Sequence, residues 1–281
     1  MTRLDGLSHD DHEPHDHDRG LEFDLSTLWE RRRVLGLIAG IGFASLVGCA
    51  SGATTGGDPT STPGSSDATA SSASCAEIPE ETAGPYPGDG SNGPNILTQS
   101  GIVRRDIRSS FGSASGVARG APLTITLTIT DTAKGCAAFQ GAAVYVWHCD
   151  INGAYSMYSA EISNENHLRG VQEADASGAV TFTSIFPGAY SGRWPHVHFE
   201  VYPSLAQATA ASNKIATSQL ALLAAVCHSV YGTEGYSASV RNLAQTSLET
   251  DNVFRDGYGS QLAKVTGDVS SGYIASLAVP V

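Results

Sequence analysis

Basic side chains are scarce in this chain of 281 residues, which holds 16 Lys and Arg against 28 Asp and Glu. The formal charge is -12 at neutral pH, and no basic stripe lies beyond the first 48 residues. Proteins that bind DNA or RNA need a positive surface that can replace the counterions of the phosphate backbone. The composition therefore argues against nucleic acid as a partner.

Long apolar runs are also lacking. Residues 34–49 form an apolar run of 16 residues that is rich in glycine and too short for a confident membrane span. Three arginines precede this run, so the region has the form of a signal peptide. The RRxVL pattern resembles a twin-arginine signal, and LVGC, which ends at Cys49, resembles a bacterial lipobox.

These features predict removal of the signal region, residues 1–48, and attachment of a diacylglycerol to Cys49. The domain would then be exported and lipid-anchored on the extracytoplasmic face of the membrane. An uncleaved single-span anchor is the alternative, and it leaves the domain on the same side. Cleavage would remove five basic and nine acidic residues and leave a formal charge of about -8.

Bulky apolar side chains are nearly absent from residues 49–74, which are small and polar. Such a segment cannot bury enough apolar surface to offset the entropy lost on ordering. We therefore predict a disordered Ser/Thr/Gly linker over residues 49–74. The ordered domain is predicted to cover residues 75–281, which is long enough for one sizeable core.

Cysteines are few, and four follow Cys49: Cys75, Cys136, Cys149 and Cys227. An exported domain with an even number of cysteines favours two disulfides, although buried thiols also fit the count. An extended strand from 141 to 149 would span about 26 Å, whereas the chain from Cys136 to its start returns at most about 18 Å. Cys136 and Cys149 should therefore not pair. We expect Cys75 to pair with one of these two and Cys227 with the other.

Apolar and β-branched residues alternate or cluster in several short segments, as is typical of strands. The segments are PLTITLTITD (122–131), AAVYVWHCD (142–150), VTFTSIF (180–186), HVHFEVY (196–202) and the tail 264–281. Strands separated by Gly, Asn and Asp predict a mainly β fold, an antiparallel β-sandwich. A few short helices are also expected, from the helical composition of residues 215–231 and 239–248.

Two histidines stand two residues apart in RWPHVHFEV, at His196 and His198. Side chains at i and i+2 of a strand share one face, so both imidazoles can bind one metal ion. Tyr155 and Tyr190 precede His196 by 41 and six residues and could complete a set of four ligands. Phenolate is a hard anionic donor that favours ferric iron, so the set predicts an Fe(III) site.

The same region resembles a known family. The segments AVYVWHCDINGAYS, RGVQEADASGAVTFTSIFPGAYSGRWPHVHFEV and TSQLAL cover much of residues 143–222, with weaker similarity in TAGPYPG and VRRDI. Their order, spacing and strand context resemble those of the intradiol ring-cleavage dioxygenases, the family of catechol and protocatechuate dioxygenases. The resemblance implies a β-sandwich enzyme that uses Fe(III) and O2 to cleave an aromatic diol between its two hydroxyl-bearing carbons, giving a cis,cis-muconate-type product.

By position, the resemblance also implies the role of each metal ligand. Tyr155 stands where an equatorial tyrosinate is expected, and Tyr190 matches the axial tyrosinate that substrate displaces and that could take up a substrate proton. His196 and His198 match the axial and equatorial histidines. All four ligand positions lie in this one chain, so we expect it to need no second related subunit, while its oligomeric state is left open.

Three further residues are expected around the substrate. Arg193 matches the arginine that lies over the bound ring, where a fixed positive charge would stabilise developing negative charge. Gln219 in TSQLAL matches a polar pocket residue, and Tyr86 in TAGPYPG could contact the ring. Arg193, Tyr190 and Gln219 are the expected catalytic residues, and Tyr86 and Arg193 the expected substrate contacts.

Two other functions are alternatives. An extracytoplasmic lipoprotein could bind a metal or a catecholate on the same scaffold without turnover, because fold alone does not define activity. The pair of tyrosines together with Arg193 favours an enzyme, since a simple zinc or copper carrier has no need of two phenolates. A cupin-like dioxygenase is disfavoured because no suitably spaced Glu and third His follow the histidine pair.

Overall fold

The computed structural model of the protein describes residues 75–281. The predicted signal region (1–48), the lipidation site Cys49 and the predicted linker (49–74) lie outside the described residues. Export and lipid attachment therefore stay predictions.

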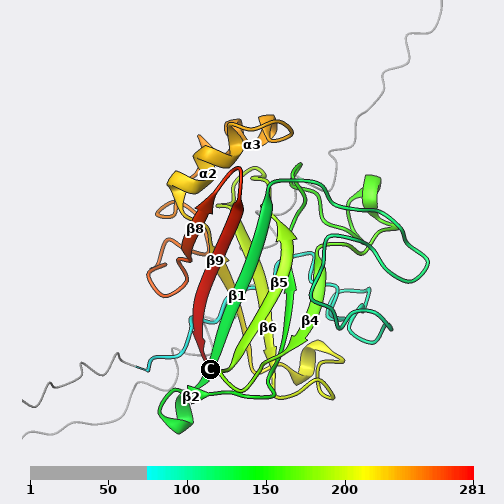
Figure 1. Ribbon diagram of the computed structural model, residues 1–281, viewed down its shortest axis with the longest axis vertical. Helices are drawn as coiled ribbons and strands as arrows, with labels where there is room; N and C mark the ends of the chain where they lie inside the picture. Colours follow the sequence, from blue (N-terminus) through cyan, green and yellow to red (C-terminus); the bar gives the residue numbers. More distant parts are fainter. Residues whose placement is uncertain (1–74) are drawn as a thin grey trace, which may run out of the picture.

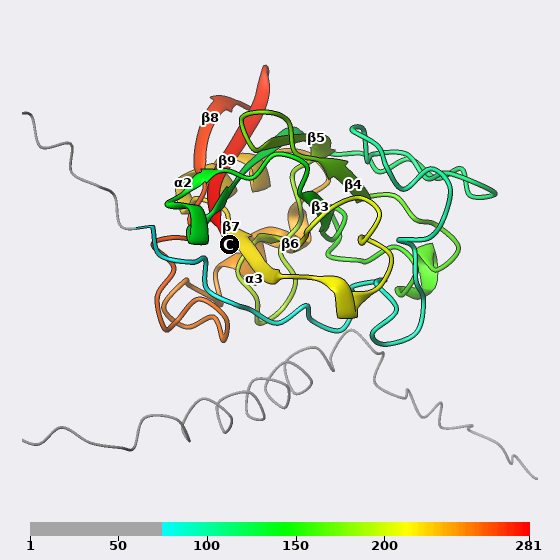
Figure 2. The ribbon, with the colours of Figure 1, turned by 90° about the horizontal axis from the view of Figure 1, so that it is seen from below.

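Two β-sheets face each other within the described part of the chain (Figures 1 and 2). The five-stranded sheet has the order β2-β1-β9-β8, with β5 also paired to β1. Its strands are β1 (Pro122–Asp131), β2 (Ala137–Ala138), β5 (Ala179–Ile185), β8 (Lys264–Asp268) and β9 (Gly272–Pro280). The four-stranded sheet has the order β4-β3-β6-β7. Its strands are β3 (Ala143–Trp147), β4 (Arg169–Glu173), β6 (His196–Tyr202) and β7 (Ala216–Ala221).

Alternation along the strands places the core between the two sheets. In β1 the residues Leu123, Ile125, Leu127 and Ile129 are buried, and the threonines between them face outward and are partly exposed. The apolar residues of β1 belong to one cluster with those of β3 and β6. Burying each Leu or Ile side chain contributes roughly 1.5–3 kcal/mol, so this layer is a main source of stability. The predicted mainly β sandwich is confirmed.

One strand pair departs from the predicted antiparallel pattern. β1 and β9 pair in parallel, from Leu123 opposite Tyr273 to Thr130 opposite Pro280, whereas the other pairs between named strands are antiparallel. Parallel neighbours need a long connection between them. That condition is met here because residues 132–271 separate β1 from β9.

The prediction of one helix over residues 215–231 is wrong in its first half. Residues 216–221 form β7, which pairs with β6 along its whole length, and α2 (Ala224–Tyr231) starts only afterwards. Pairing with a central strand and burial on both faces outweigh the helical composition of this segment. A second short helix, α3 (Ser237–Leu243), lies beside α2 at one end of the sandwich (Figure 1). Residues 75–281 also contain three short 3-10 turns: η2 (Thr132–Lys134), η3 (Ala160–Ile162) and η4 (Ala211–Asn213).

The described part of the chain contains no helix with the length and apolar character needed to cross a bilayer.

The cysteine prediction is half right. Cys75 and Cys136 form a disulfide, one of the two expected pairings, and Cys136 does not pair with Cys149. The expected second disulfide is absent from residues 75–281, because Cys149 and Cys227 are buried free thiols. They belong to different apolar clusters, Cys227 to the one between the sheets and Cys149 to the one on the outer face of the four-stranded sheet.

The outer face of the four-stranded sheet carries mainly polar and aromatic side chains, with few aliphatic ones. One row crosses all four strands, because Arg169 lies opposite Trp147, Trp147 opposite His198, and His198 opposite Gln219. All four side chains are buried. The N-terminal part of the domain, coloured cyan, runs along this face (Figure 2). The sheet therefore presents a second, polar interior on the side away from the sandwich core.

Candidate active site and metal centre

The two histidines come from the first half of β6. His196 and His198 point to the outer face of the four-stranded sheet, while Val197 between them belongs to the cluster between the sheets. The strand therefore places both imidazoles on one surface, as their spacing predicts.

The two tyrosines come from loops that meet at this surface. Tyr155 follows the turn after β3, and Tyr190 lies in the loop between β5 and β6. Gly153 lets these loops approach each other, since its φ is +84° and a Cβ added there would lie 2.8 Å from the Tyr190 Cβ. Only glycine adopts this conformation readily and leaves that space open.

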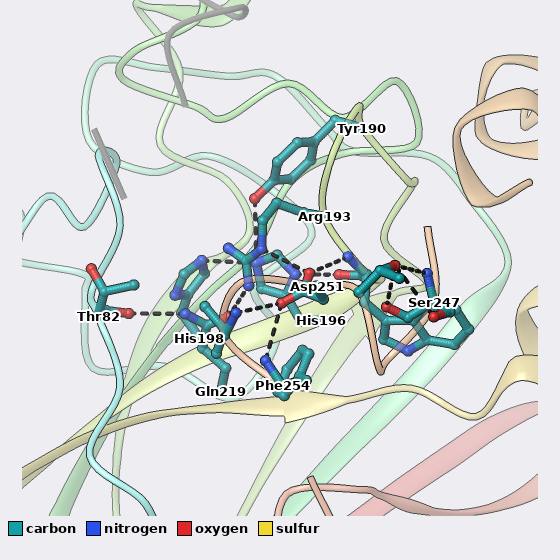
Figure 3. Close-up of polar contacts among 12 residues, drawn as sticks. Thr82, Tyr190, Arg193, His196, His198, Gln219, Ser247, Asp251 and Phe254 are labelled. Atoms are coloured by element: carbon teal, nitrogen blue, oxygen red, sulfur yellow. Dashed lines mark hydrogen bonds and ion pairs between the residues drawn. The ribbon is translucent and has the colours of Figure 1, made fainter. Parts of the chain in front are cut away.

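The four expected metal ligands form a continuous chain of polar contacts, and three of them, Tyr190, His196 and His198, are labelled in Figure 3. The hydroxyl oxygens of Tyr155 and Tyr190 are 3.5 Å apart, and the Tyr190 hydroxyl is 3.4 Å from His196 Nε2. His196 Nε2 is in turn 3.0 Å from His198 Nε2. Two phenol oxygens and two imidazole nitrogens therefore converge on one small volume, although 41 residues separate Tyr155 from His196.

Both imidazoles are held in the neutral form that binds metals. Burial lowers the pKa of His196, and the charge of Arg193 lowers it further. Burial also lowers the pKa of His198 well below its usual range, with a further contribution from His196. The Nδ1 atom of His196 donates to the Trp194 carbonyl, which leaves the Nε2 lone pair directed toward the other ligands.

The two tyrosines differ in exposure. Tyr155 is only 2% exposed, and burial, followed by the neighbouring Tyr190, raises its phenol pKa well above 10. Tyr190 is only partly buried and lies closer to solvent. A nearby multivalent cation is the interaction that would reverse the shift at Tyr155 and favour the phenolate.

Arg193 lies beside this cluster and is fixed by two buried partners (Figure 3). Its Nε atom is 3.0 Å from Asp251 Oδ2, and its Nη2 atom donates to Gln219 Oε1 at 2.6 Å. Asp251 also accepts backbone hydrogen bonds from Trp194, Val253 and Phe254. Asp251 could not be predicted from the sequence, because it lies 58 residues after Arg193 and is marked by no local motif.

Gln219 is completely buried, and both ends of its amide are engaged. Its oxygen accepts from Arg193, and its Nε2 atom donates to the Thr82 carbonyl at 2.9 Å. The amide therefore contacts Arg193 and the N-terminal segment at the same time. This geometry makes Gln219 a support for the arginine.

Tyr86 lies against the same cluster. Its ring centroid is 5.0 Å from that of Tyr155 and 5.2 Å from that of Tyr158, so the three rings form one aromatic wall. Tyr86 is half-buried, with its remaining surface accessible. The structure thus brings together all the residues expected from the sequence within 75–281, while their roles stay predictions.

Within residues 75–281, no group of three or more His, Cys, Asp or Glu side chains is arranged to hold a metal ion. Metal binding at this cluster would therefore depend on the phenolates, because only two imidazoles are present. His148, seven residues before Tyr155, instead contacts Ser184 Oγ at 2.7 Å and the Cys149 carbonyl at 2.8 Å, and is structural.

Comparison with solved structures identifies the fold. An intradiol ring-cleavage dioxygenase from Tetranychus urticae superposes with a TM-score of 0.53 at 23% identity, covering 64% of this chain and 87% of that one. A second dioxygenase structure, Tetur07g02040, gives a TM-score of 0.53 at 23% identity, with coverages of 64% and 86%. No protein-family model and no curated protein matches the sequence. The chain thus has the fold of the intradiol ring-cleavage dioxygenases.

Proposed function

We propose that this protein is a non-haem Fe(III) intradiol dioxygenase that cleaves catechol-type diols with O2 between the two hydroxyl-bearing carbons. The product would be of the cis,cis-muconate type. The observation that carries the proposal is the convergence of the Tyr155, Tyr190, His196 and His198 donor atoms, linked by separations of 3.5, 3.4 and 3.0 Å, on a dioxygenase fold.

The donor set fits ferric iron. Two neutral imidazoles and two phenols in one buried volume offer nitrogen ligands together with hard oxygen ligands, a combination that suits a trivalent ion better than zinc or copper. The four residues named above would hold the ion. When bound, the ion would draw electron density from a chelated diol and so make the aromatic ring reactive toward O2.

The unequal burial of the two tyrosines supports a division of labour between them. Tyr155 is enclosed, so it would stay in place throughout the reaction. Tyr190 sits in a loop nearer to solvent, so it is the ligand better placed to give way to substrate and to take up a proton at its phenol oxygen. Arg193, held by Asp251 and Gln219, would keep its guanidinium fixed beside the ring while negative charge develops there.

The charges around Arg193 favour an uncharged diol as the substrate. Asp251 already compensates this guanidinium, so Arg193 is poorly suited to bind a substrate carboxylate as well. The aromatic wall of Tyr86, Tyr155 and Tyr158 suits a flat ring. Catechol and its neutral derivatives are therefore the proposed substrate class, with protocatechuate a poorer substrate.

The test is direct. Iron-loaded protein should be red-brown through tyrosinate-to-iron charge transfer, and anaerobic catechol should change that colour. With 18O2, both labelled atoms should appear in a muconate-type product, which distinguishes ring cleavage from simple oxidation of the diol to a quinone.

Matched tyrosine variants locate the colour. Tyr155→Phe and Tyr190→Phe should each alter the charge-transfer band, and the double variant should lose it. Tyr273→Phe, at a tyrosine buried between the sheets, should leave it unchanged. Colourless protein after iron loading would refute the proposed Fe(III) dioxygenase function. Coloured protein that binds catechol without consuming O2 would support the binding lipoprotein instead.

We also propose that the protein is exported and carries a lipid on Cys49, on the strength of the sequence pattern alone. Expression in a bacterial host with a labelled fatty acid should mark the membrane fraction. Cys49→Ala should abolish the label and release the protein, and Cys75→Ala should not abolish it. A label that persists in the Cys49→Ala variant would exclude this anchor.

A further inference from the structure

Arg169, the first residue of β4, is 1% exposed and has only neutral hydrogen-bond partners. It donates to Ser156 Oγ at 3.1 Å, Ser156 O at 2.9 Å, Tyr86 O at 2.9 Å, Pro87 O at 2.7 Å and the Tyr145 hydroxyl at 2.9 Å. No carboxylate is among these partners in the part of the chain that the structure describes. Burying a guanidinium without a counter-charge is costly, so all five bonds are needed to offset the lost hydration.

One set of these bonds reaches the Tyr155 ligand. Ser156 follows Tyr155 directly in the chain and is 3% exposed. Arg169 binds both the hydroxyl and the carbonyl oxygen of Ser156, and that hydroxyl also donates to the His167 carbonyl at 2.7 Å. The backbone that carries Tyr155 is thereby tied to the start of β4.

A second set reaches His198 through stacked rings. His198 Nδ1 has no hydrogen-bond partner among the described residues, so apart from the Nε2 contact with His196 its ring is held by stacking on Trp147, at 4.8 Å and 5° between planes. The Trp147 indole nitrogen also has no partner there, and its ring stacks on Tyr145 at 5.0 Å. Tyr145 is the member of this column that is held by hydrogen bonds, and one of them comes from Arg169.

A third set holds the aromatic wall. Arg169 binds the carbonyl oxygens of Tyr86 and Pro87, and the Tyr86 ring lies 5.0 Å from the Tyr155 ring. The wall and the ligand it touches are therefore fixed by the same side chain.

We propose that Arg169 is a positioning residue that sets Tyr155, His198 and Tyr86 relative to one another, and so fixes the metal geometry and the substrate wall together. The inference rests on the proposed function. The planar guanidinium offers five donors in a rigid arrangement, whereas a lysine ammonium offers three on a flexible stem. Arg169→Lys keeps the charge and loses this geometry.

The experiment compares wild-type protein with Arg169→Lys after iron loading. Iron affinity, measured by competition with a chelator, should fall about 10–100-fold, as is usual when residues that orient metal ligands are replaced. The tyrosinate-to-iron band should shift, and KM for catechol should rise along with a fall in kcat because wall and ligand move together. The near-ultraviolet circular dichroism of the iron-free protein should also change, since the Tyr145–Trp147 stack loses its anchor.

Arg104→Lys is the matched control. Arg104 is a half-buried arginine in the segment that runs beside β4, and it donates to the carbonyl oxygens of Arg169, Asn166 and Ser109 without contacting the expected metal ligands. The Arg104→Lys variant should be less stable than the wild type, with little change in iron affinity or in the tyrosinate-to-iron charge-transfer band.

Two milder variants decide the matter if Arg169→Lys does not fold. Ser156→Ala removes the hydroxyl bonds to Arg169 and to the His167 carbonyl but keeps the Ser156 carbonyl bond, so it should shift the band less than Arg169→Lys does. Tyr145→Phe removes the Arg169 hydrogen bond that anchors the ring stack on His198. It should weaken iron binding with less effect on the charge-transfer band.

The outcomes separate the two proposals. Wild-type protein without a charge-transfer band refutes the proposed function, and this inference with it. A normal wild-type band together with unchanged iron affinity, band and KM in Arg169→Lys, or in both milder variants, overturns the positioning role alone.

Discussion

The Arg193 guanidinium and the Asp251 carboxylate form a buried ion pair, with Nε 3.0 Å from Oδ2 and side chains 3% and 0% exposed. Asp251 accepts three backbone N–H bonds in addition, so its loop and the loop carrying Arg193 are locked together. Burial by itself would raise the pKa of Asp251, but the charge of Arg193 and the Trp194 N–H keep it below its usual value. The pair therefore contributes both to stability and to the placement of the candidate catalytic arginine.

Asp251→Asn should lower the free energy of unfolding by about 3 kcal/mol at neutral pH, because it leaves a buried guanidinium uncompensated. Since the folded-state pKa lies below the unfolded value of about 3.9, this contribution is fully present above that pH and is lost as the pH falls through the lower folded pKa. Urea denaturation of both proteins at neutral and acidic pH measures the difference.

The exposed pair of Arg108 and Asp106, 2.7 Å apart, provides the control. Asp106→Asn should cost less than about 1 kcal/mol, because solvent screens this pair. Equal losses in the two variants would mean that the buried pair has no special importance. In kinetic assays Asp251→Asn should lower kcat, and Asp106→Asn should not.

Gly153→Ala should disturb the contact between the two tyrosine loops. The added Cβ would lie 2.8 Å from the Tyr190 Cβ, and φ at this position is +84°. Gly141→Ala is the control, since φ is also +84° there but nothing lies within 4 Å of the added Cβ. Both variants should lose about 1 kcal/mol from backbone strain. Only Gly153→Ala should also weaken iron binding and shift the tyrosinate band, and equal behaviour would contradict a role in positioning Tyr190.

Glu81→Gln should stabilise the protein at neutral and alkaline pH. Burial, and next the charge of Asp256, raise the pKa of Glu81 to about 8. Between the unfolded value of about 4.3 and about 8, the native state keeps a proton that the unfolded state has lost, so wild-type stability falls as the pH rises through this window. The glutamine variant lacks this loss, and its advantage should grow up to about pH 8 and then level off.

Chemical denaturation at several pH values across this window tests the prediction. Glu249→Gln is the control, because Glu249 is exposed and its pKa is lowered by hydrogen bonds, so it does not titrate in this range. Parallel pH profiles for wild type and Glu81→Gln would show that Glu81 ionises normally in the folded protein.

Much of the fold was readable from local pattern. The alternation in residues 122–131, 180–186 and 196–202 predicted strands that the structure contains as β1, β5 and β6. The composition of residues 216–221 predicts a helix, but these residues form β7. Their pairing with β6 is a contact between segments distant in the chain, and local composition cannot predict such a contact.

The candidate site divides in the same way. The spacing of His196 and His198 and the family resemblance pointed to the ligand residues, and the structure brings these side chains together. The sequence did not predict the roles of Asp251, Trp147 and Arg169, because each contacts a residue far away in the chain. Such partners become visible only when the strand register is known.

The amino-acid sequence alone determined which donor types are available, that two of them share a strand face, and that a mainly β domain follows a signal-like region. Tertiary structure decided which cysteines meet, which arginine is neutralised by a carboxylate and which is held by neutral oxygens, and how the ligands are oriented. The reason is physical: local periodicity fixes the face on which a side chain lies, but its partner across a sheet depends on the register and loop packing of the whole domain.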